Sequence, residues 1–332
     1  MVAWLAAVQA QDYAGAKWAL GLRMQQATDA EIDQSFADGE ILRTHALRPT
    51  WHFVTPADIR WILALTAPRV HLANAFMYRK LELDGELFKR CNTVLDGALR
   101  GGQQLTRDEL RDILDKSGLA VSDNLRMAYI MMQAELDGLI CSGARRGRQF
   151  TYALLEERVP PVATMDRQTA LVELARRYFA SRGPATVQDF AKWSGLTITD
   201  ANRGLEAVKG YLQTETANGQ IYWLTETIAA SQELSPSAHM LSIYDEYISG
   251  YKDRSTMGND DIGARLFALG NALSYIAVID GQIVGTWKRK LTKNAVIVET
   301  NLFSSLSEAE DRAVNAAIQR YGDFLNLPVV AA

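Results

Sequence analysis

Residues 104–155 read QLTRDELRDILDKSGLAVSDNLRMAYIMMQAELDGLICSGARRGRQFTYALL. Thr106 stands three residues before Glu109, which is the spacing of a capping box at a helix start. The short helix that begins here reaches the turn at Gly118, and a second helix follows over residues 124–138. Two β-prone runs then flank a turn rich in glycine and arginine, which predicts a β-hairpin.

The same order recurs elsewhere in the chain. Residues 168–225 contain a helix start at Thr186, a second helix and a hairpin around Asn218 and Gly219. Residues 2–54 contain the capping box of Thr28 and Glu31 and end in an alternating, extended run. Helix, turn, helix and hairpin make up a winged helix, whose second helix usually lies in a DNA major groove. Winged helices also bind proteins, so this order alone does not fix the function.

A further helix start is predicted at Thr55, with Pro56 in the first helical position. The last third of the chain is predicted to consist mainly of β-strands. Residues 274–303 contain strand runs separated by turns at Asp280–Gly281 and Lys293–Asn294, and residues 307–325 form an amphipathic helix. We therefore expect an α+β fold of tandem winged-helix repeats followed by a C-terminal antiparallel β half-barrel. The expected boundaries are 1–100 (first winged helix with connecting helices), 101–160 (second), 161–228 (third) and 229–332 (β-rich domain with its closing helix).

The composition narrows the class of protein. A chain of 332 residues with 48% hydrophobic and 22% charged residues is typical of a globular protein of two or three domains. It contains no apolar run of about 18 residues, and its first residues, MVAWLAAVQAQD, lack the basic region of a secretory signal. Two cysteines, Cys91 and Cys141, make neither a disulfide framework nor a metal-ligand cluster. We expect a cytoplasmic protein without membrane association, metal or other cofactor.

The net charge of −4 argues against a protein coated by nucleic acid, but it leaves room for a local basic groove. Three arginines, Arg145, Arg146 and Arg148, occupy the glycine-rich turn of the second hairpin, where phosphate or minor-groove contact is expected. Gln149 and Tyr152 are weaker candidates beside them. The alternative is an ordinary solvated loop.

Two other strands offer candidate DNA contacts. In residues 47–54, alternation predicts that Arg48, Thr50 and His52 face outward together with Val54. His52 is then a DNA contact or a pocket residue, or else a structural histidine. On a later strand, Lys288 and Lys290 are expected on one face and Arg289 on the other.

Residues 244–255 are a dense group of polar and aromatic side chains. Asp245, Tyr247 and Tyr251 are candidates for lining a pocket that holds an acid or an anionic group. An internal network of salt bridges and hydrogen bonds is the alternative. Trp193 is expected in the core of the third winged helix.

Five segments, in this order, resemble one known family. They are VQAQDYAGAKWAL (8–20), LRPTWHFV (47–54), AELDGLICSGARRGRQFTYAL (134–154), TVQDFAKWSGL (186–196) and YDEYISGYKDRS (244–255). With these segments the chain resembles winged-helix DNA-binding proteins of the HTH_42 class, whose characterised members are DNA glycosylases. The resemblance extends over nearly the whole chain.

In that family the catalytic motif is glutamine, an apolar residue and glutamine in the AlkZ-like (azinomycin-resistance) branch. The third position is aspartate in the YcaQ-like branch. This chain has Gln9, Ala10 and Gln11. The resemblance therefore implies the AlkZ-like branch, with Gln9 and Gln11 as catalytic residues and double-stranded DNA as the partner; no obligate protein partner is evident.

Two carboxamides limit the chemistry. An amide carbonyl can orient a water molecule but is not a strong base. A purine alkylated at N7 or N3 already carries positive charge, so it leaves without being protonated. We therefore expect a monofunctional glycosylase that acts on cationic, alkylated purines, with interstrand crosslinks as an extension of that class. A non-enzymatic DNA-binding or regulatory protein is the alternative.

The pair also sets a geometric condition. Positions i and i+2 point the same way in an extended segment but not on a helix. If both amides hold one water, residues 9–11 must be extended or lie at a helix edge, and Asp12 can then cap the following helix. The alternative is a continuous helix over residues 2–11, with both glutamines in solvent.

Overall fold

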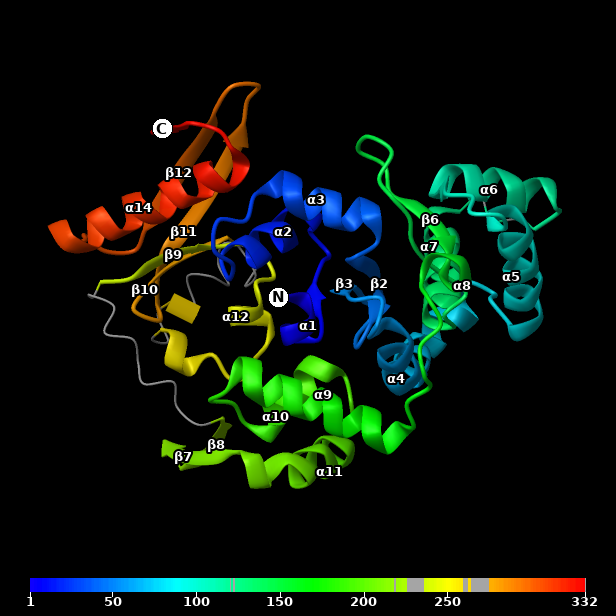
Figure 1. The fold of residues 1–332 in the computed structure, drawn as a ribbon, viewed down its shortest axis with the longest axis horizontal. Helices are drawn as coiled ribbons and strands as arrows, with labels where there is room; N and C mark the ends of the chain where they lie inside the picture. Colours follow the sequence, from blue (N-terminus) through cyan, green and yellow to red (C-terminus); the bar gives the residue numbers. More distant parts are fainter. Residues whose placement is uncertain are drawn as a thin grey trace.

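The computed structural model describes residues 1–119, 121, 123–217, 219–225, 236–258, 262–263 and 275–331. Within these residues the fold is mixed α+β, with helical units arranged around two three-stranded sheets, a two-stranded hairpin and a five-stranded sheet (Figure 1). Asn218, one of the two residues expected at the turn of the third hairpin, lies outside the described residues.

The first segment contains the first sheet, in which β3 lies between β1 and β2. α1 ends at Leu5, and Ala6 adopts φ 61°, so the chain turns out of the helix before β1 begins. Asp12 caps α2 by accepting a hydrogen bond from the Gly15 N–H, and Thr28 and Glu31 form the expected capping box of α3. The elements are α1 (Val2–Leu5), β1 (Val8–Gln9), α2 (Tyr13–Gly21), α3 (Asp29–Asp38), β2 (Leu42–Ala46) and β3 (Thr50–Val54).

The prediction that a helix starts at Pro56 is wrong, because α4 starts at Ile59. Residues 56–58 form a turn instead. The Thr55 hydroxyl closes this turn by donating to the Asp58 carboxylate over 2.6 Å, and the same carboxylate accepts the Trp61 indole N–H over 3.0 Å. Two long helices, α4 (Ile59–Lys80) and α5 (Gly85–Leu99), then lead away from the first sheet.

The second and third segments repeat the order of helices and a hairpin. The helix starts predicted at Thr106 and Thr186 are confirmed, and capping boxes with Glu109 and Asp189 close them. The second segment contains β4 (Leu105–Thr106), α6 (Arg107–Lys116), α7 (Asn124–Leu136), β5 (Ile140–Ser142), β6 (Thr151–Leu154) and α8 (Leu155–Arg158). The third contains α9 (Arg167–Arg182), α10 (Val187–Ser194), α11 (Ile198–Val208), the short η1 (Lys209–Tyr211), β7 (Gln213–Ala217) and β8 (Gln220–Leu224).

The C-terminal segment is a curled five-stranded half-barrel with the order β13-β12-β11-β10-β9. Four strands are antiparallel as expected, and β13 adds a parallel strand at one edge, because the chain returns along β12 after α14. The elements are β9 (Ala238–Leu241), α12 (Glu246–Ser249), η2 (Ser255–Met257), β10 (Ile276–Ile279), β11 (Gln282–Leu291), β12 (Val296–Leu302), α14 (Glu308–Leu325) and β13 (Val329–Ala331).

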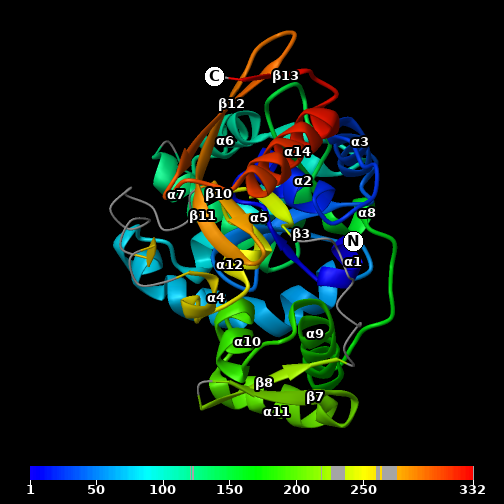
Figure 2. The same ribbon diagram turned by 90° about the vertical axis from the view of Figure 1, so that its left-hand side faces the viewer.

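The first sheet lies at the centre of the molecule. Figure 1 shows the half-barrel on one side of it, the second segment on the other and α9–α11 below. The β11–β12 hairpin and the loop between β5 and β6 both project at the upper edge, which Figure 2 shows from a second direction. One hydrophobic core joins β2 and α4 to α9, α10 and α11, and a second core joins α2 and α3 to the half-barrel and α14.

Candidate functional site

Gln9 ends the short strand β1 and Gln11 lies at the bend that follows, which excludes a continuous helix over residues 2–11. β1 pairs with β3 so that Val8 lies opposite Phe53 and Gln9 opposite His52. The pairing continues one residue further, because the Ala10 N–H donates to the Trp51 carbonyl over 2.7 Å. Gln9 is buried and Gln11 is exposed. Gln11 lies two residues beyond Gln9, at the bend between β1 and α2, where strand alternation no longer applies.

The register defines a polar face on the first sheet, formed by Gln9, Thr44, Thr50 and His52. Thr44 and Gln9 lie directly opposite His52 on its two neighbouring strands. Residues opposite one another on adjacent antiparallel strands have their Cβ atoms about 4.5–5.5 Å apart. Thr50, two residues before His52 on β3, is the partly exposed member of this face.

The orientation expected for the strand of residues 47–54 is wrong for His52 and Val54, which are fully buried. The parity is as predicted, but this face of the sheet is covered, because Leu42, Ala46 and Val54 pack in the core that includes α4, α9 and Trp193. His52 therefore lies beneath the surface. Arg48 and Thr50 are partly exposed.

His52 is held as a neutral imidazole. Its Nδ1 lies 2.9 Å from the Thr50 carbonyl oxygen, which can only accept a hydrogen bond, so Nδ1 carries the proton and Nε2 is an acceptor. Burial, and next the charge of Arg48, lower the pKa of His52 well below its usual value. Within the described part of the chain, Nε2 has no hydrogen-bond partner.

Other buried polar atoms on or beside this face also have no partner among the described residues. They are Gln9 Oε1, Thr44 Oγ1, Thr50 Oγ1, Arg48 Nε and Arg48 Nη2. Burial lowers the pKa of Arg48, and Glu246 acts in the opposite direction. Because buried polar groups in proteins are nearly always hydrogen-bonded, a concentration of unpartnered atoms marks a place where a ligand or water binds.

A buried network fixes the backbone of β1. Glu246 accepts the Gln9 N–H over 2.8 Å and the Arg182 Nη2 over 2.6 Å, and the Trp193 indole N–H donates to it over 3.0 Å. Arg182 also donates to the carbonyls of Leu5 and Ala7. Burial opposes ionisation of Glu246, but Arg182 and the Gln9 N–H outweigh it and hold the pKa of Glu246 below its usual value. The position of the glutamine motif thus depends on α9, α10 and α12.

The candidate pocket residues of segment 244–255 have internal partners. Asp245 is buried and accepts Arg23 Nη2 over 2.6 Å. The Tyr247 hydroxyl donates to the Gly281 carbonyl and the Tyr251 hydroxyl to the Arg182 carbonyl, both over 2.7 Å. Burial raises the pKa of Tyr251 to about 12. These side chains connect the segment to the end of α2, to the turn between β10 and β11 and to α9.

The arginines of the second hairpin differ in their contacts. Arg145 lies over the rings of Tyr13 and Phe150 at 4.8 and 5.3 Å from their centroids. Arg146 is exposed and forms an ion pair with Glu109 over 2.7 Å. Arg148 is exposed and lines a hollow of about 690 Å³.

That arginine-lined hollow lies between the first sheet and the second segment, and its walls include Arg43, Trp51, Arg107, Arg111, Arg148 and Tyr152. Arg43 stacks between the rings of Trp51 and Phe150, 4.1 and 4.4 Å from their centroids. Burial lowers the pKa of Arg43 to about 10. Its Nε donates to the carbonyl of Ala10, the central residue of the glutamine motif, over 2.9 Å. The sequence did not single out Arg43. Alternation along β2 and β3 predicts which residues share a face of the sheet, but it does not predict that this face borders a hollow.

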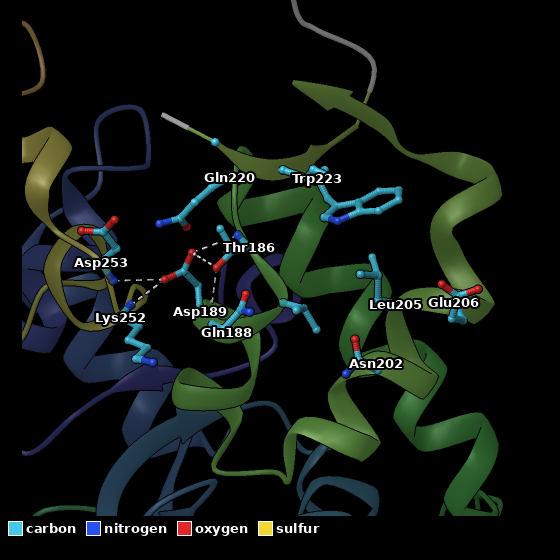
Figure 3. A pocket seen from close by; sticks show the side chains of 13 residues that line it. Thr186, Gln188, Asp189, Asn202, Leu205, Glu206, Gln220, Trp223, Lys252 and Asp253 are labelled. Carbon is cyan, nitrogen blue, oxygen red and sulfur yellow. Dashed lines mark hydrogen bonds between the residues drawn. The ribbon is translucent and has the colours of Figure 1, made fainter. Parts of the chain in front are cut away.

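Lys288 and Lys290 are exposed on β11, whereas Arg289 points to the other face and contacts Tyr275 and Tyr321, as alternation predicted. A second hollow, of about 730 Å³, lies between α10, α11 and the β7–β8 hairpin (Figure 3). The Asp189 carboxylate on its wall accepts hydrogen bonds from the Thr186 hydroxyl and from the Lys252 N–H.

Neither a metal centre nor a membrane span is found in the described parts of the chain. No group of three or more histidine, cysteine, aspartate or glutamate side chains there is placed to hold a metal ion. None of the helices in those parts is both long enough and apolar enough to cross a membrane.

Comparisons with known proteins agree with the resemblance. A family model described as DNA glycosylase AlkZ-like matches residues 2–324. The chain is 26% identical over 315 residues to an interstrand DNA cross-link repair glycosylase from Streptomyces sahachiroi, with 86% of this chain and 80% of that protein covered. The solved structure of Streptomyces sahachiroi DNA glycosylase AlkZ matches with a TM-score of 0.77 at 19% identity, over 100% of this chain and 92% of that one. Because the family model spans nearly the entire sequence, this chain belongs to the AlkZ-like DNA glycosylase family.

Proposed function

We propose that this protein is a monofunctional DNA glycosylase that hydrolyses the N-glycosidic bond of cationic, N7- or N3-alkylated purines. Family membership supports a glycosylase, and the glutamine motif is the observation that carries the more specific proposal. Gln9 is buried at the end of β1, and Gln11 is exposed two residues further on, at the bend before α2.

The substrate class follows from the chemistry of the two side chains. Glycosidic cleavage of a neutral base usually needs a carboxylic acid to protonate the leaving group. Carboxamides cannot donate a proton in that way, but they can orient a water by hydrogen bonds. A cationic purine needs only that water and stabilisation of the sugar cation. Uracil and undamaged purines are therefore not expected as substrates.

The basic groups around the first sheet are proposed to hold the duplex. Arg148 and the other arginines of the hollow lie on one side of the sheet, and the exposed Lys288 and Lys290 lie on the β11–β12 hairpin. Such side chains bind backbone phosphates without reading the sequence. Arg43 connects the hollow to the glutamine motif, because it lines the hollow and donates to the Ala10 carbonyl.

The decisive experiment measures base release from duplex DNA that contains 7-methylguanine under single-turnover conditions. We expect Gln9→Ala and Gln11→Ala each to lower the rate by about 10²-fold, because misplacing a reacting group costs that much. Gln168→Ala, at an exposed glutamine of α9, is the matched control. If the wild-type protein releases no 7-methylguanine, or if both variants equal it, the proposed reaction is wrong.

The same assay distinguishes the alternative and extends the substrate. A non-enzymatic DNA-binding protein would shift the modified duplex in a gel without releasing base. The name of the Streptomyces sahachiroi relative motivates a second substrate, a duplex with an interstrand crosslink between N7-alkylated purines. Each arm of that lesion is a cationic purine, so we expect unhooking that also depends on Gln9 and Gln11.

A further inference from the structure

The directly paired residues Gln9 and His52 present two buried acceptors to the same region. Gln9 Oε1 and His52 Nε2 both lack a donor among the described residues. His52 Nε2 is an acceptor because Nδ1 donates to the Thr50 carbonyl. Two acceptors cannot bond to each other, but one molecule with two O–H donors satisfies both. A water is the smallest such molecule, and cross-strand neighbours are close enough to share it.

Arg48 supplies hydrogen-bond donors for the oxygen of the same water. Arg48 has two buried N–H groups, at Nε and Nη2, with no acceptor in the residues that the structure covers. Its charge lies close enough to His52 to disfavour a second proton on the ring. Arg48 can therefore donate to one lone pair of a water held by Gln9 and His52, which leaves the other lone pair for attack.

We propose that His52 and Gln9 together hold the hydrolytic water, and that His52 Nε2 accepts the proton that this water loses. This inference rests on the proposed glycosylase function. Attack forms the bond between the water oxygen and C1′ as the C1′–N bond breaks, and the electron pair of that bond neutralises the cationic purine. The water proton passes to His52 Nε2. The positive charge that began on the purine is therefore carried by the imidazolium once the bond to water has formed.

The motif has an exposed and a buried end. Gln11 is exposed and Thr50 is partly exposed, whereas Gln9 and His52 are buried. In this proposal the sugar approaches from the side of Gln11 and Thr50. The charged and titratable groups that act on His52 are Arg48, His45 and Arg182.

Two amide substitutions separate the acceptor from a structural role. The side-chain amide of His52→Asn reaches the position of Nδ1 and can keep the hydrogen bond to Thr50, but it does not reach Nε2. The longer amide of His52→Gln can place its oxygen near Nε2, so it keeps a hydrogen-bond acceptor there. His71→Asn is the control, because His71 is a partly buried histidine on α4 with its own partners, Tyr78 and Asp137.

The measurement is single-turnover release of 7-methylguanine, with duplex affinity and thermal unfolding measured in parallel. We expect His52→Asn to lower the rate by about 10²-fold, as loss of a proton acceptor does, with unchanged DNA affinity. His52→Gln should recover only the part of that loss that comes from holding the water, because an amide does not take up its proton. If His52→Asn does not fold, His52→Phe, which keeps a ring in the buried site, takes its place.

The outcomes separate the two proposals. A wild-type protein that releases base while the asparagine and glutamine variants match it overturns the role of His52 and leaves the glycosylase function intact. Losses that are accompanied by weaker duplex binding or by a lower unfolding temperature also overturn it, because they indicate a structural role. A wild-type protein with no activity overturns the glycosylase function first, and the role of His52 with it.

Discussion

His52 is a buried histidine whose neutral form is favoured by burial and by the nearby cations. These outweigh the hydrogen bond from Nδ1 to the Thr50 carbonyl, and Arg48 has the largest effect among the charged groups. The ring is therefore an acceptor at neutral pH and needs no deprotonation to serve as one.

This environment predicts a pH effect on stability. The pKa of His52 is lowered in the folded state, so the unfolded state binds a proton that the folded state does not, at pH values below the unfolded pKa of about 6.5. Stability should therefore fall by about 1.4 kcal/mol for each pH unit below that value, until the folded pKa is reached. Urea unfolding of the wild type and of His52→Phe between pH 8 and pH 5 tests this. Parallel curves for the two proteins would contradict it.

At the scale of elements, the β11–β12 hairpin is the simplest candidate for contact with the DNA backbone. Its strands pair from Gly285 with Leu302 to Leu291 with Val296, and the hairpin projects beyond the half-barrel (Figure 1). Alternation sends Arg289 to the tyrosines on the α14 side and leaves Lys288 and Lys290 exposed. One face of β11 is thus structural and the other is free to meet phosphate.

The hairpin prediction concerns salt dependence. If Lys288 and Lys290 each neutralise one phosphate, replacing both with alanine removes about 1.8 from the slope of log affinity against log salt concentration. Fluorescence anisotropy with a labelled duplex at several salt concentrations measures that slope. Lys89→Ala, at an exposed lysine of α5, is the control and should leave the slope unchanged. An unchanged slope in the double variant would exclude the hairpin as a backbone contact.

At the scale of the whole molecule, the position of the glutamine motif depends on segments that are far apart in the sequence. Glu246 lies 237 residues from Gln9 and 64 from Arg182, yet its carboxylate binds both. Both side chains of the ion pair are almost fully buried, at 2% and 3% exposure. A small rearrangement of α9 or α12 would therefore move β1.

Breaking this pair should be costly. Glu246→Ala leaves Arg182 buried without its carboxylate, which costs about 3–5 kcal/mol of stability in comparable cases. Arg312→Ala removes a pair whose side chains are 72% and 96% exposed, and should cost about 0–1 kcal/mol. Chemical denaturation of both variants tests the difference. Similar losses would mean that the network does not hold the N-terminal segment in place.

Local features of the fold were predictable from the sequence because they depend on neighbouring residues. The capping boxes at Thr28, Thr106 and Thr186 form, Asp12 caps α2, and the C-terminal strands follow their alternation. The start of α4 was not predictable in the same way, because Asp58, which the sequence places inside the helix, closes the preceding turn and binds Trp61 and Arg177.

The sequence by itself determined the parity of each strand, the α+β class, the half-barrel and the Gln9-Ala10-Gln11 motif that the resemblance assigned to catalysis. Only the tertiary structure decided which face of the first sheet is covered, so His52 is buried beside Gln9 instead of exposed. It also decided that Asp245, Tyr247 and Tyr251 have internal partners and that Arg43 joins the motif to a hollow. The physical reason is that alternation fixes two faces of a strand from local geometry, whereas burial and hydrogen-bond partners depend on segments hundreds of residues away.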